Sequence, residues 1–191
     1  DIAGTWSFAE DVFGRVPLGW RGSHGNATKH AISVGGVKDN FMRVLEVKGN
    51  ATPHYIDTHV RDQASGTVEC YVYLSDLSKN GLGYLAFRYG ETDAFSVHVH
   101  NQEWYFNSSA ESTVIADVPE PQEDEWAHVR VDFCVSGDNY MGLSPGKAQV
   151  YVDGIQSPQE CTFSTPQQAI NYLEIGTKSG TQGAVAYIDA I

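Results

Sequence analysis

The segment Trp126-Ala-His-Val-Arg-Val-Asp-Phe133 alternates apolar and polar residues, and the same alternation recurs in three later segments. These are Ala148-Gln-Val-Tyr-Val-Asp-Gly154, Tyr172-Leu-Glu-Ile-Gly176 and Ala186-Tyr-Ile-Asp-Ala-Ile191. A period of two residues is typical of a β-strand with one buried face. Asp153-Gly154 suits a turn that needs a positive φ. Four such strands, separated by turn-forming residues, indicate an antiparallel sandwich.

Further strand-like segments fill the rest of the chain, and nearly every gap between them holds Gly, Asn, Asp, Ser or Pro. The expected strands are 5–8, 29–35, 41–48, 55–61, 67–74, 83–89, 93–100, 103–107, 112–118, 126–135, 148–153, 171–176 and 184–191. The only helical feature that we expect is a single turn near 166–170. Short strands without helical crossovers predict an all-β, two-sheet antiparallel sandwich. Since no linker divides the chain, we expect a single domain over 1–191.

The composition argues against two kinds of partner. The chain has 191 residues, with 12 Lys and Arg against 24 Asp and Glu, which gives a net charge of −12. Such a field repels phosphate backbones, so we expect no nucleic-acid partner. No run of about 18 apolar residues occurs, so we expect no membrane insertion. The chain begins at Asp1 without an initiator Met, from which we expect a mature or excised domain.

The three cysteines, Cys70, Cys134 and Cys161, allow at most one internal disulfide and one free thiol. Cys70 shares the apolar face of 67–74, which predicts a buried thiol. Cys134 ends the strand 126–135 on its polar face, and Cys161 follows in a polar loop. A Cys134–Cys161 bridge is the preferred pairing, and no bridge at all is the open alternative. Such scattered cysteines disfavour a structural zinc site.

Three Asn-x-Ser/Thr sequons begin at Asn26, Asn50 and Asn107. A chain of this length carries about one such sequon by chance, so three of them favour a secreted glycoprotein modified at these asparagines. Pro53 directly follows the second sequon and disfavours its use. The alternative is that these Asn and Thr residues only populate turns.

Three successive segments carry aromatic and ionisable residues on the face opposite to their apolar residues. Because short turns join 67–74, 83–89 and 93–100, we expect them to be neighbours in one sheet. The surface that they would form, flanked by the next strand, consists of Tyr71, Tyr73, Tyr84, Arg88, His98, His100 and Trp104. Aromatic rings stack on the C–H face of a sugar, and Arg, His and Tyr hydroxyl groups hydrogen-bond its hydroxyls. The pattern predicts a glycan-binding surface, with a solvated outer sheet face as the alternative.

The same residue types would also suit a polysaccharide lyase, which needs an acid, a base and a cation beside the sugar carboxylate. The chain lacks the Arg-x-Glu-x-Arg and Tyr-Phe-Lys-x-Gly patterns of such lyases and the Glu-x-Asp-x-x-Glu pattern of retaining glucanases. The sequence therefore favours a protein without catalytic residues. The spacing His98-x-His100 suits zinc only with a third ligand, and two solvated histidines are the alternative.

Taken in order, four motifs resemble those of the laminin-G-like, concanavalin A-like jelly-roll domains of large extracellular proteins. They are Trp-x-His-Val-x-Val-x-Phe, Val-Tyr-Val-Asp-Gly, Leu-x-Ile-Gly and the closing Tyr-Ile-Asp-Ala-Ile. The opening segment 6–20 is similar to the family's Phe-Glu-x-x-x-x-Gly-x-x-Pro-x-Gly-Trp, so the resemblance spans the whole chain. It implies that the first and last strands, 4–8 and 184–191, pair. It also implies that ligands bind the concave sheet or the loops at its rim.

Many members of this family hold calcium, so the resemblance implies a structural Ca²⁺ in the opening loop. Where the family has Glu after the opening Phe, this chain has Ala9, so Glu10 or Asp11 would have to supply that ligand. Asp189 matches the family's closing Asp and would be a second ligand. Ca²⁺ takes six to eight oxygens, so carbonyl groups and water would complete the shell. The alternative is that Asp189 only hydrogen-bonds the opening loop.

We therefore expect an extracellular or cell-surface module without catalytic activity, which binds a glycan or an extracellular protein through its concave sheet. One alternative is a self-assembling subunit of a surface layer, filament or virion, because exposed edge strands make such assembly easy. The other is a polysaccharide lyase or glycoside hydrolase, because enzymes share this scaffold and the fold does not decide the function.

Overall fold

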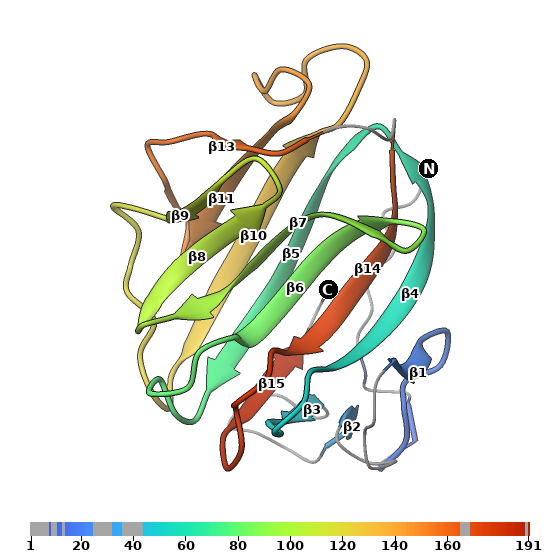
Figure 1. Ribbon diagram of the computed structural model, residues 1–191, viewed down its shortest axis with the longest axis vertical. Helices are drawn as coiled ribbons and strands as arrows, with labels where there is room; N and C mark the ends of the chain where they lie inside the picture. Colours follow the sequence, from blue (N-terminus) through green and yellow to red (C-terminus); the bar gives the residue numbers. More distant parts are fainter. Residues whose placement is uncertain are drawn as a thin grey trace.

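The chain forms two antiparallel β-sheets packed face to face, as the ribbon of the computed structural model shows (Figure 1). The structure describes residues 8, 11–12, 14–24, 32–35, 44–164, 169–189 and 191. The predicted all-β, two-sheet antiparallel sandwich is confirmed. In the part of the chain that is described, no helix has the length and apolarity that a membrane crossing requires.

The first sheet has seven strands in the order β1-β4-β14-β6-β7-β8-β9 and faces the viewer in Figure 1. Its strands are β1 (Arg21–His24), β4 (His54–Gln63), β14 (Ile170–Thr177), β6 (Leu82–Tyr89), β7 (Thr92–His100), β8 (Glu103–Ser108) and β9 (Ser112–Val114). Strands β6, β7, β8 and β9 follow one another along the chain, whereas β14 inserts between β4 and β6. This insertion brings residues from three distant parts of the sequence side by side.

The second sheet has eight strands, in the order β12-β11-β10-β5-β15-β3-β2, with β13 paired to β11. Its strands are β12 (Ile155–Gln156), β11 (Lys147–Val152), β10 (Trp126–Cys134), β5 (Ser65–Leu74), β15 (Val185–Asp189), β3 (Leu45–Lys48), β2 (Ile32–Val34) and β13 (Cys161–Thr162). Both edges of β15 pair within this sheet, with β5 on one side and β3 on the other. The predicted partner of this last strand, 4–8, lies outside the described residues apart from Phe8.

The core between the sheets is centred on phenylalanines from both layers. Phe87 and Phe95 stack with their ring centroids 4.3 Å apart, and Phe133 of the second sheet meets Phe87 edge-on at 5.5 Å. Phe163 adds a further ring 4.7 Å from Phe95. Because offset and edge-on ring pairs add to the gain from apolar burial, this cluster holds the sheets together.

The predicted strand positions agree with the structure within a few residues for most of the chain. For example, 93–100 is observed as β7, Thr92–His100. The expected strand 112–118 ends early, at Val114, and Asp117 then takes a positive φ of 56° that a strand does not adopt. The short strands β1, β12 and β13 were not predicted, because two to four residues show no periodicity. The helical turn near 166–170 lies outside the described residues, apart from 169 and 170.

The expected neighbourhood of the segments 67–74, 83–89 and 93–100 is wrong. Strands β6 and β7 do pair in the first sheet, but β5 lies in the second sheet between β10 and β15. The connection 75–81 crosses from one sheet to the other instead of turning back as a hairpin. Leu77, buried to 8% exposure, and the Leu77 N–H bond to Glu123 Oε1 at 2.8 Å anchor this crossing.

The predicted disulfide between Cys134 and Cys161 is also wrong, since all three cysteines are free and buried. Cys134 lies opposite Lys147 of β11, whereas Cys161 lies opposite Ala148, the next residue along the same strand. Successive residues of a strand point to opposite faces, so one thiol faces outward beneath a loop while the other faces the core. The predicted burial of Cys70 is confirmed at 2% exposure.

We expect the native protein to leave a thiol reagent such as DTNB almost unreacted, and the unfolded protein to react with three equivalents. Burial raises the pKa of both Cys70 and Cys161 to about 12, so neither forms the reactive thiolate at neutral pH. The measurement is thiol titration without reductant, before and after adding guanidinium chloride. Only one reactive thiol in the unfolded protein would show that a disulfide exists after all.

Candidate functional site

The strand register places polar residues from β4, β14 and β6 in adjacent rows on the outer face of the seven-stranded sheet. Glu174 of β14 lies opposite Asp57 of β4, and two residues further along Gly176 lies between Tyr55 and Tyr84. The intervening residues of these strands, such as Ile56 and Ile175, point to the opposite face and fill the core. A period-2 pattern in three strands thus assembles a polar surface over an apolar layer.

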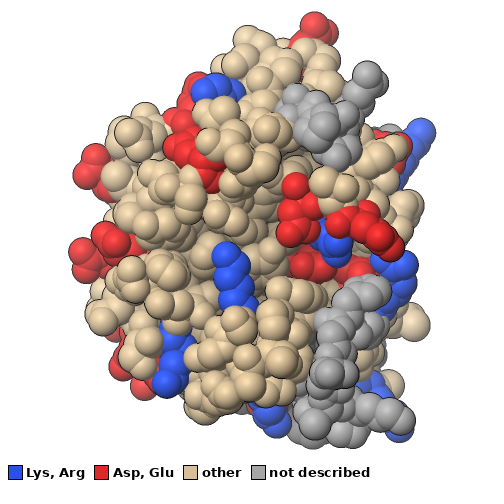
Figure 2. Space-filling model, viewed as in Figure 1, with Lys and Arg blue, Asp and Glu red and all other residues tan. Residues whose placement is uncertain are grey.

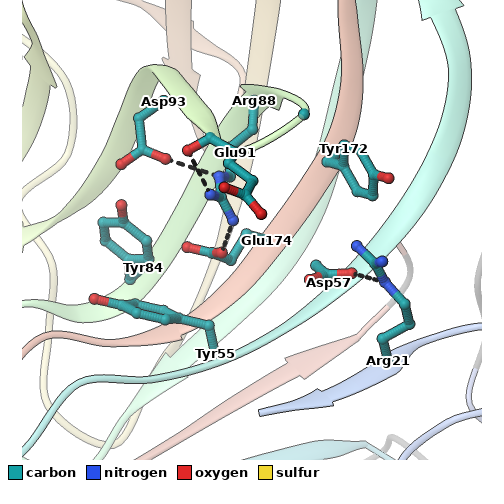
Figure 3. A pocket seen from close by; sticks show the side chains of 10 residues that line it. Arg21, Tyr55, Asp57, Tyr84, Arg88, Glu91, Asp93, Tyr172 and Glu174 are labelled. Carbon is teal, nitrogen blue, oxygen red and sulfur yellow. Dashed lines mark hydrogen bonds and ion pairs between the residues drawn. The ribbon is translucent and has the colours of Figure 1, made fainter. Parts of the chain in front are cut away.

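A hollow of about 470 Å³ opens on this surface (Figure 3). It is lined by Arg21, Tyr55, Asp57, Tyr84, Arg88, Gly90, Glu91, Asp93, Tyr172 and Glu174. Three tyrosine rings and the charged side chains surround the same space in this view. Figure 2 shows acidic side chains gathered around a basic one on this face. The site therefore combines aromatic surface with fixed charges.

Arg88 is the centre of the charged network. Its Nη1 donates to Glu174 Oε2 at 2.5 Å, and its Nη2 donates to the backbone oxygen of Glu91 at 2.8 Å. Its Nε lies 2.8 Å from Asp93 Oδ1, in an ion pair whose angle is not that of a directed hydrogen bond. Glu174 is almost fully buried, with a side-chain exposure of 5%. The guanidinium therefore compensates a buried charge and fixes the hairpin that follows β6.

Burial raises the pKa of Glu174 to about 6, even though the Arg88 guanidinium acts in the opposite direction. The negative charges of Asp93 and Asp57 contribute to the same upward shift. Folding thus favours the protonated form of Glu174. Its contribution to stability is full below the unfolded pKa of 4.5 and is lost as the pH rises through 6.

A second ion pair joins Arg21 of β1 to Asp57 at the edge of the hollow. Arg21 Nε donates to Asp57 Oδ1 at 2.7 Å, and its guanidinium carbon lies 4.9 Å from the centroid of the Tyr172 ring. The Asp57 side chain is 1% exposed and that of Arg21 is 58% exposed. The hydrogen bond and charge of Asp57 raise the pKa of Arg21. One face of Tyr172 is thereby covered by a cation.

Tyr55 and Tyr84 meet across Gly176, with their ring centroids 5.4 Å apart. A Cβ on Gly176 would lie 2.7 Å from Tyr55 Cδ1, so glycine leaves the space that the ring occupies. Burial raises the pKa of both phenols, and the charges of Glu174 and Asp93 add to the shift. Both phenols therefore keep their proton at neutral pH and can donate a hydrogen bond.

The outer face continues past the hollow to a histidine and a lysine. His98 is 3% exposed, and its Nε2 lies 3.2 Å from Lys178 Nζ, which also lies 5.5 Å from the centroid of the Tyr84 ring. Burial, together with the charges of Lys178 and His100, lowers the pKa of His98 to about 3. A neutral imidazole therefore accepts a hydrogen bond from the lysine ammonium group.

The seven predicted ligand-binding residues do not form one surface. Tyr84, Arg88, His98 and His100 do share the outer face of the seven-stranded sheet, and Tyr84 and Arg88 line the hollow. Tyr71 and Tyr73 lie on the second sheet, in β5. Trp104 is buried in the core with 2% exposure, because it lies opposite Val99 on the apolar face of β7.

Tyr73 is 3% exposed, so it is not an open platform either. Its hydroxyl group donates to Asp124 Oδ1 at 2.6 Å, and its ring lies between Trp126 and Tyr187. Tyr71 is 37% exposed and packs against His128. The aromatic residues of β5 therefore belong to a separate cluster on the other side of the molecule.

Of the ten residues that line the hollow, the predicted binding surface contained only Tyr84 and Arg88. The other eight were missed, and they are Arg21, Tyr55, Asp57, Gly90, Glu91, Asp93, Tyr172 and Glu174. The polar positions of β4 and β14 carry the same alternation as those of β6. However, nothing in the sequence shows that β14 inserts between β4 and β6. The signal that could have found Tyr172 and Glu174 is their position on the polar face of the Leu-x-Ile-Gly motif.

The calcium prediction remains untested by this structure. Asp11 Oδ1 accepts a hydrogen bond from Leu18 N at 2.8 Å, and Asp189 lies opposite Tyr71 at the end of β15. Glu10 lies outside the described residues. Among those described, no group of three or more His, Cys, Asp or Glu side chains could hold a metal ion, and this includes His98 and His100.

Two of the three predicted glycosylation sites lie in the described part of the chain, and Asn26 does not. Asn107 lies in β8, and its side chain is half-buried. Asn50 is also half-buried, and its Oδ1 accepts a hydrogen bond from Ala51 N at 2.6 Å. Glycosylation at these positions stays a prediction.

No protein-family model matches the chain, and no curated protein matches it. Solved structures do resemble it. A sialidase aligns with a TM-score of 0.69 at 11% identity, over 98% of this chain and 18% of the sialidase. The transglycosylase Crh5 aligns with a TM-score of 0.60 at 14% identity, over 98% of this chain and 81% of its own.

A third similar structure is domain 4 of AbnA, a GH43 extracellular arabinanase from Geobacillus stearothermophilus, in complex with arabinotriose. It aligns with a TM-score of 0.56 at 12% identity, over 98% of this chain and 92% of that domain. At such low identities the likeness shows the fold alone, a two-sheet sandwich of the jelly-roll type.

Proposed function

We propose that this domain binds a glycan, without catalysis, in the hollow on the outer face of its seven-stranded sheet. The observation that carries the proposal is the grouping of the half-buried rings of Tyr55 and Tyr172 around the ion-pair network of Arg88. Tyr84, at 5% exposure, packs beneath Tyr55 and supports its ring. Sugars are recognised by rings that contact their C–H faces and by polar groups that hydrogen-bond their hydroxyls. The hollow offers both kinds of contact within about 470 Å³.

The rigidity of the site supports the same proposal. Each polar group of the network is held by a partner from another strand or loop, so the site is organised before a ligand arrives. Gly90 N, at the tip of the β6–β7 hairpin, donates to Asn171 Oδ1 at 2.8 Å and so ties this tip to β14. Preorganisation of this kind lowers the entropy cost of binding. One domain with a similar fold was solved in complex with arabinotriose, which supports the proposal that a sandwich of this type binds a glycan.

We expect Tyr55→Ala to weaken glycan binding about ten-fold, since the loss of a stacking ring costs roughly 1.4 kcal/mol. The matched control is Tyr71→Ala, which removes an exposed tyrosine from the other sheet and should leave affinity unchanged. A glycan array or affinity gels would first find a ligand for the parent, and calorimetry would then compare the variants. No ligand for the parent, or equal losses in both variants, would contradict the proposal.

A glycoside hydrolase is the second candidate, favoured by two carboxylates on adjacent strands. Glu174 and Asp57 lie opposite each other, and a carboxyl group with a pKa of about 6 suits a general acid. However, Arg88 and Arg21 hold these carboxylates in ion pairs, which favours binding over proton transfer. A reducing-end assay over a polysaccharide panel, with Glu174→Gln as the inactive control, would decide between the two functions.

The proposal includes an extracellular location and a structural Ca²⁺ near the opening loop, with Asp11 and Asp189 among the ligands. The motifs that resemble laminin-G-like domains support both parts, and the three sequons support the extracellular location. A ligand that binds only the folded state raises the midpoint of thermal unfolding. Thermal unfolding in Ca²⁺ and in EDTA would test the metal, and equal midpoints would count against it.

A further inference from the structure

The charges around the hollow limit which glycans can enter it, provided that the hollow is the glycan site proposed above. Four carboxylates line it, those of Asp57, Glu91, Asp93 and Glu174, against two guanidinium groups. With every group ionised, four negative and two positive charges leave a surplus of two negative charges. The surplus is not buried, because the Asp93 side chain is 57% exposed and Glu91 is exposed as well.

The two guanidinium groups are already neutralised by these acids. Arg88 donates to Glu174 and to the Glu91 backbone oxygen and forms an ion pair with Asp93, so each of its three nitrogens already contacts an oxygen. Arg21 donates to Asp57 and lies over the Tyr172 ring. An acidic sugar is usually recognised by a guanidinium that can offer two parallel N–H groups to its carboxylate. Arg88 cannot do so without breaking the contacts that compensate Glu174.

The negative field reaches the aromatic groups of the hollow. The charge of Asp93 raises the pKa values of Tyr55, Tyr84 and Glu174, which means that it acts across the site. A sugar carboxylate or sulfate in the same space would meet the same repulsion. An ammonium group would instead be attracted by the exposed carboxylates at the rim.

Lys178 is a further cation on this face, and the charge of Asp93 acts on it as well. However, its Nζ is held by contacts with the buried His98 and with the ring of Tyr84. The Lys178 side chain is half-buried, and burial lowers its pKa. A cation held in this way has little freedom to turn toward a ligand anion.

We propose that the hollow selects amine-bearing glycans over neutral ones, and neutral glycans over acidic ones, through the exposed carboxylates of Asp93 and Glu91. The cationic group of the ligand lies at the rim, beside the β6–β7 hairpin that carries Glu91 and Asp93. The tyrosine rings contribute equally to all three ligand types, so charge alone sets the order.

The test uses three oligosaccharides that share a β-1,4-linked glucose-type backbone. They are a chitosan oligosaccharide with free amines, a cello-oligosaccharide, and a cello-oligosaccharide oxidised to glucuronate. We expect the amine form to bind about two- to five-fold more tightly than the neutral form, and the acidic form to bind more weakly by a similar factor. Both differences should shrink in 0.5 M NaCl, where exposed charges are screened.

Glu91→Gln and Asp93→Asn should each reduce the preference for the amine form, and Asp138→Asn is the matched control. Asp138 is an exposed acid in the β10–β11 loop and lies outside the hollow. Glu91→Gln is the cleaner variant because the Glu91 contact to Arg88 uses only its backbone oxygen. If Asp93→Asn fails to fold, Glu91→Gln still tests the proposal.

The outcomes separate this inference from the function on which it rests. If none of the three oligosaccharides and no other glycan binds, the proposed function fails. If the glucuronate form binds as tightly as the amine form, or if Glu91→Gln and Asp138→Asn change the preference equally, the function stands and the charge selection is overturned. Both the function and the charge selection are supported if affinity falls in the order amine, neutral, acidic, and if Glu91→Gln reduces the differences between these affinities.

Discussion

Arg88→Ala is expected to lower the free energy of unfolding at pH 7.5 by about 3–5 kcal/mol, because it leaves the buried Glu174 carboxylate without its cation. Glu174 is 5% exposed, so water cannot replace the lost partner. The substitution also frees the Glu91 backbone oxygen and Asp93, which adds to the cost. Chemical denaturation monitored by tryptophan fluorescence would measure the change.

The pH dependence of this loss identifies its cause. Arg88 lowers the pKa of Glu174, so in Arg88→Ala the pKa lies above its present value of about 6. Below that pKa Glu174 takes up a proton and no uncompensated charge remains. We therefore expect Arg88→Ala to be much less destabilising at pH 5 than at pH 7.5.

The double variant Arg88→Ala/Glu174→Gln provides the control. Because it removes both charges, we expect it to be more stable at pH 7.5 than Arg88→Ala alone, by about 1–3 kcal/mol. Its stability should also show little of the pH dependence seen in the single variant. If the double variant loses as much free energy of unfolding as the two single variants lose together, the loss in Arg88→Ala comes from packing and not from a buried charge.

The structure also shows which parts of the fold the sequence could predict. A strand that buries one face must alternate, so β5, β10 and β11 could be located to within two residues from local sequence. Pairing between strands leaves no such local pattern, because it depends on which loops turn back and which cross. The connection 75–81 and a hairpin loop of the same length have similar compositions, so β5 was assigned to the wrong sheet.

The same limit applies to the candidate site. Tyr84 and Arg88 could be predicted because each lies on the polar face of its own strand, opposite buried Leu85 and Phe87. The partnership of Glu174 with Arg88 could not be predicted in this way. The two residues are 86 positions apart along the chain, and they meet only because β14 lies between β4 and β6. Cys134 shows the same limit. Parity within its own strand did not exclude a bridge to Cys161, and only the pairing of both segments with β11 places the two thiols on opposite faces.

Gly176→Ala is expected to destabilise the protein by about 3 kcal/mol or more, at or beyond the upper end of the usual cost of overpacking. A Cβ at this position would lie 1.8 Å from the backbone oxygen of His54 and 2.7 Å from Tyr55 Cδ1. A flexible side chain could move aside, but His54 begins β4 and pairs with β14, so its backbone carbonyl cannot move without disturbing this end of the ladder. Thermal or chemical unfolding would measure the loss.

Gly154→Ala is the matched comparison for this substitution. Gly154 has a positive φ of 78° and nothing within 4 Å of its added Cβ, so its replacement costs only backbone strain, about 1–2 kcal/mol. If both variants lose the same stability, the close approach at Gly176 is not what fixes β14 against β4. If Gly176→Ala is the worse variant and also binds glycan less tightly than Gly154→Ala, one residue sets both the strand contact and the meeting of Tyr55 with Tyr84. The hollow is then a consequence of how closely these two strands approach, because the rings that line it meet only where the intervening residue has no side chain.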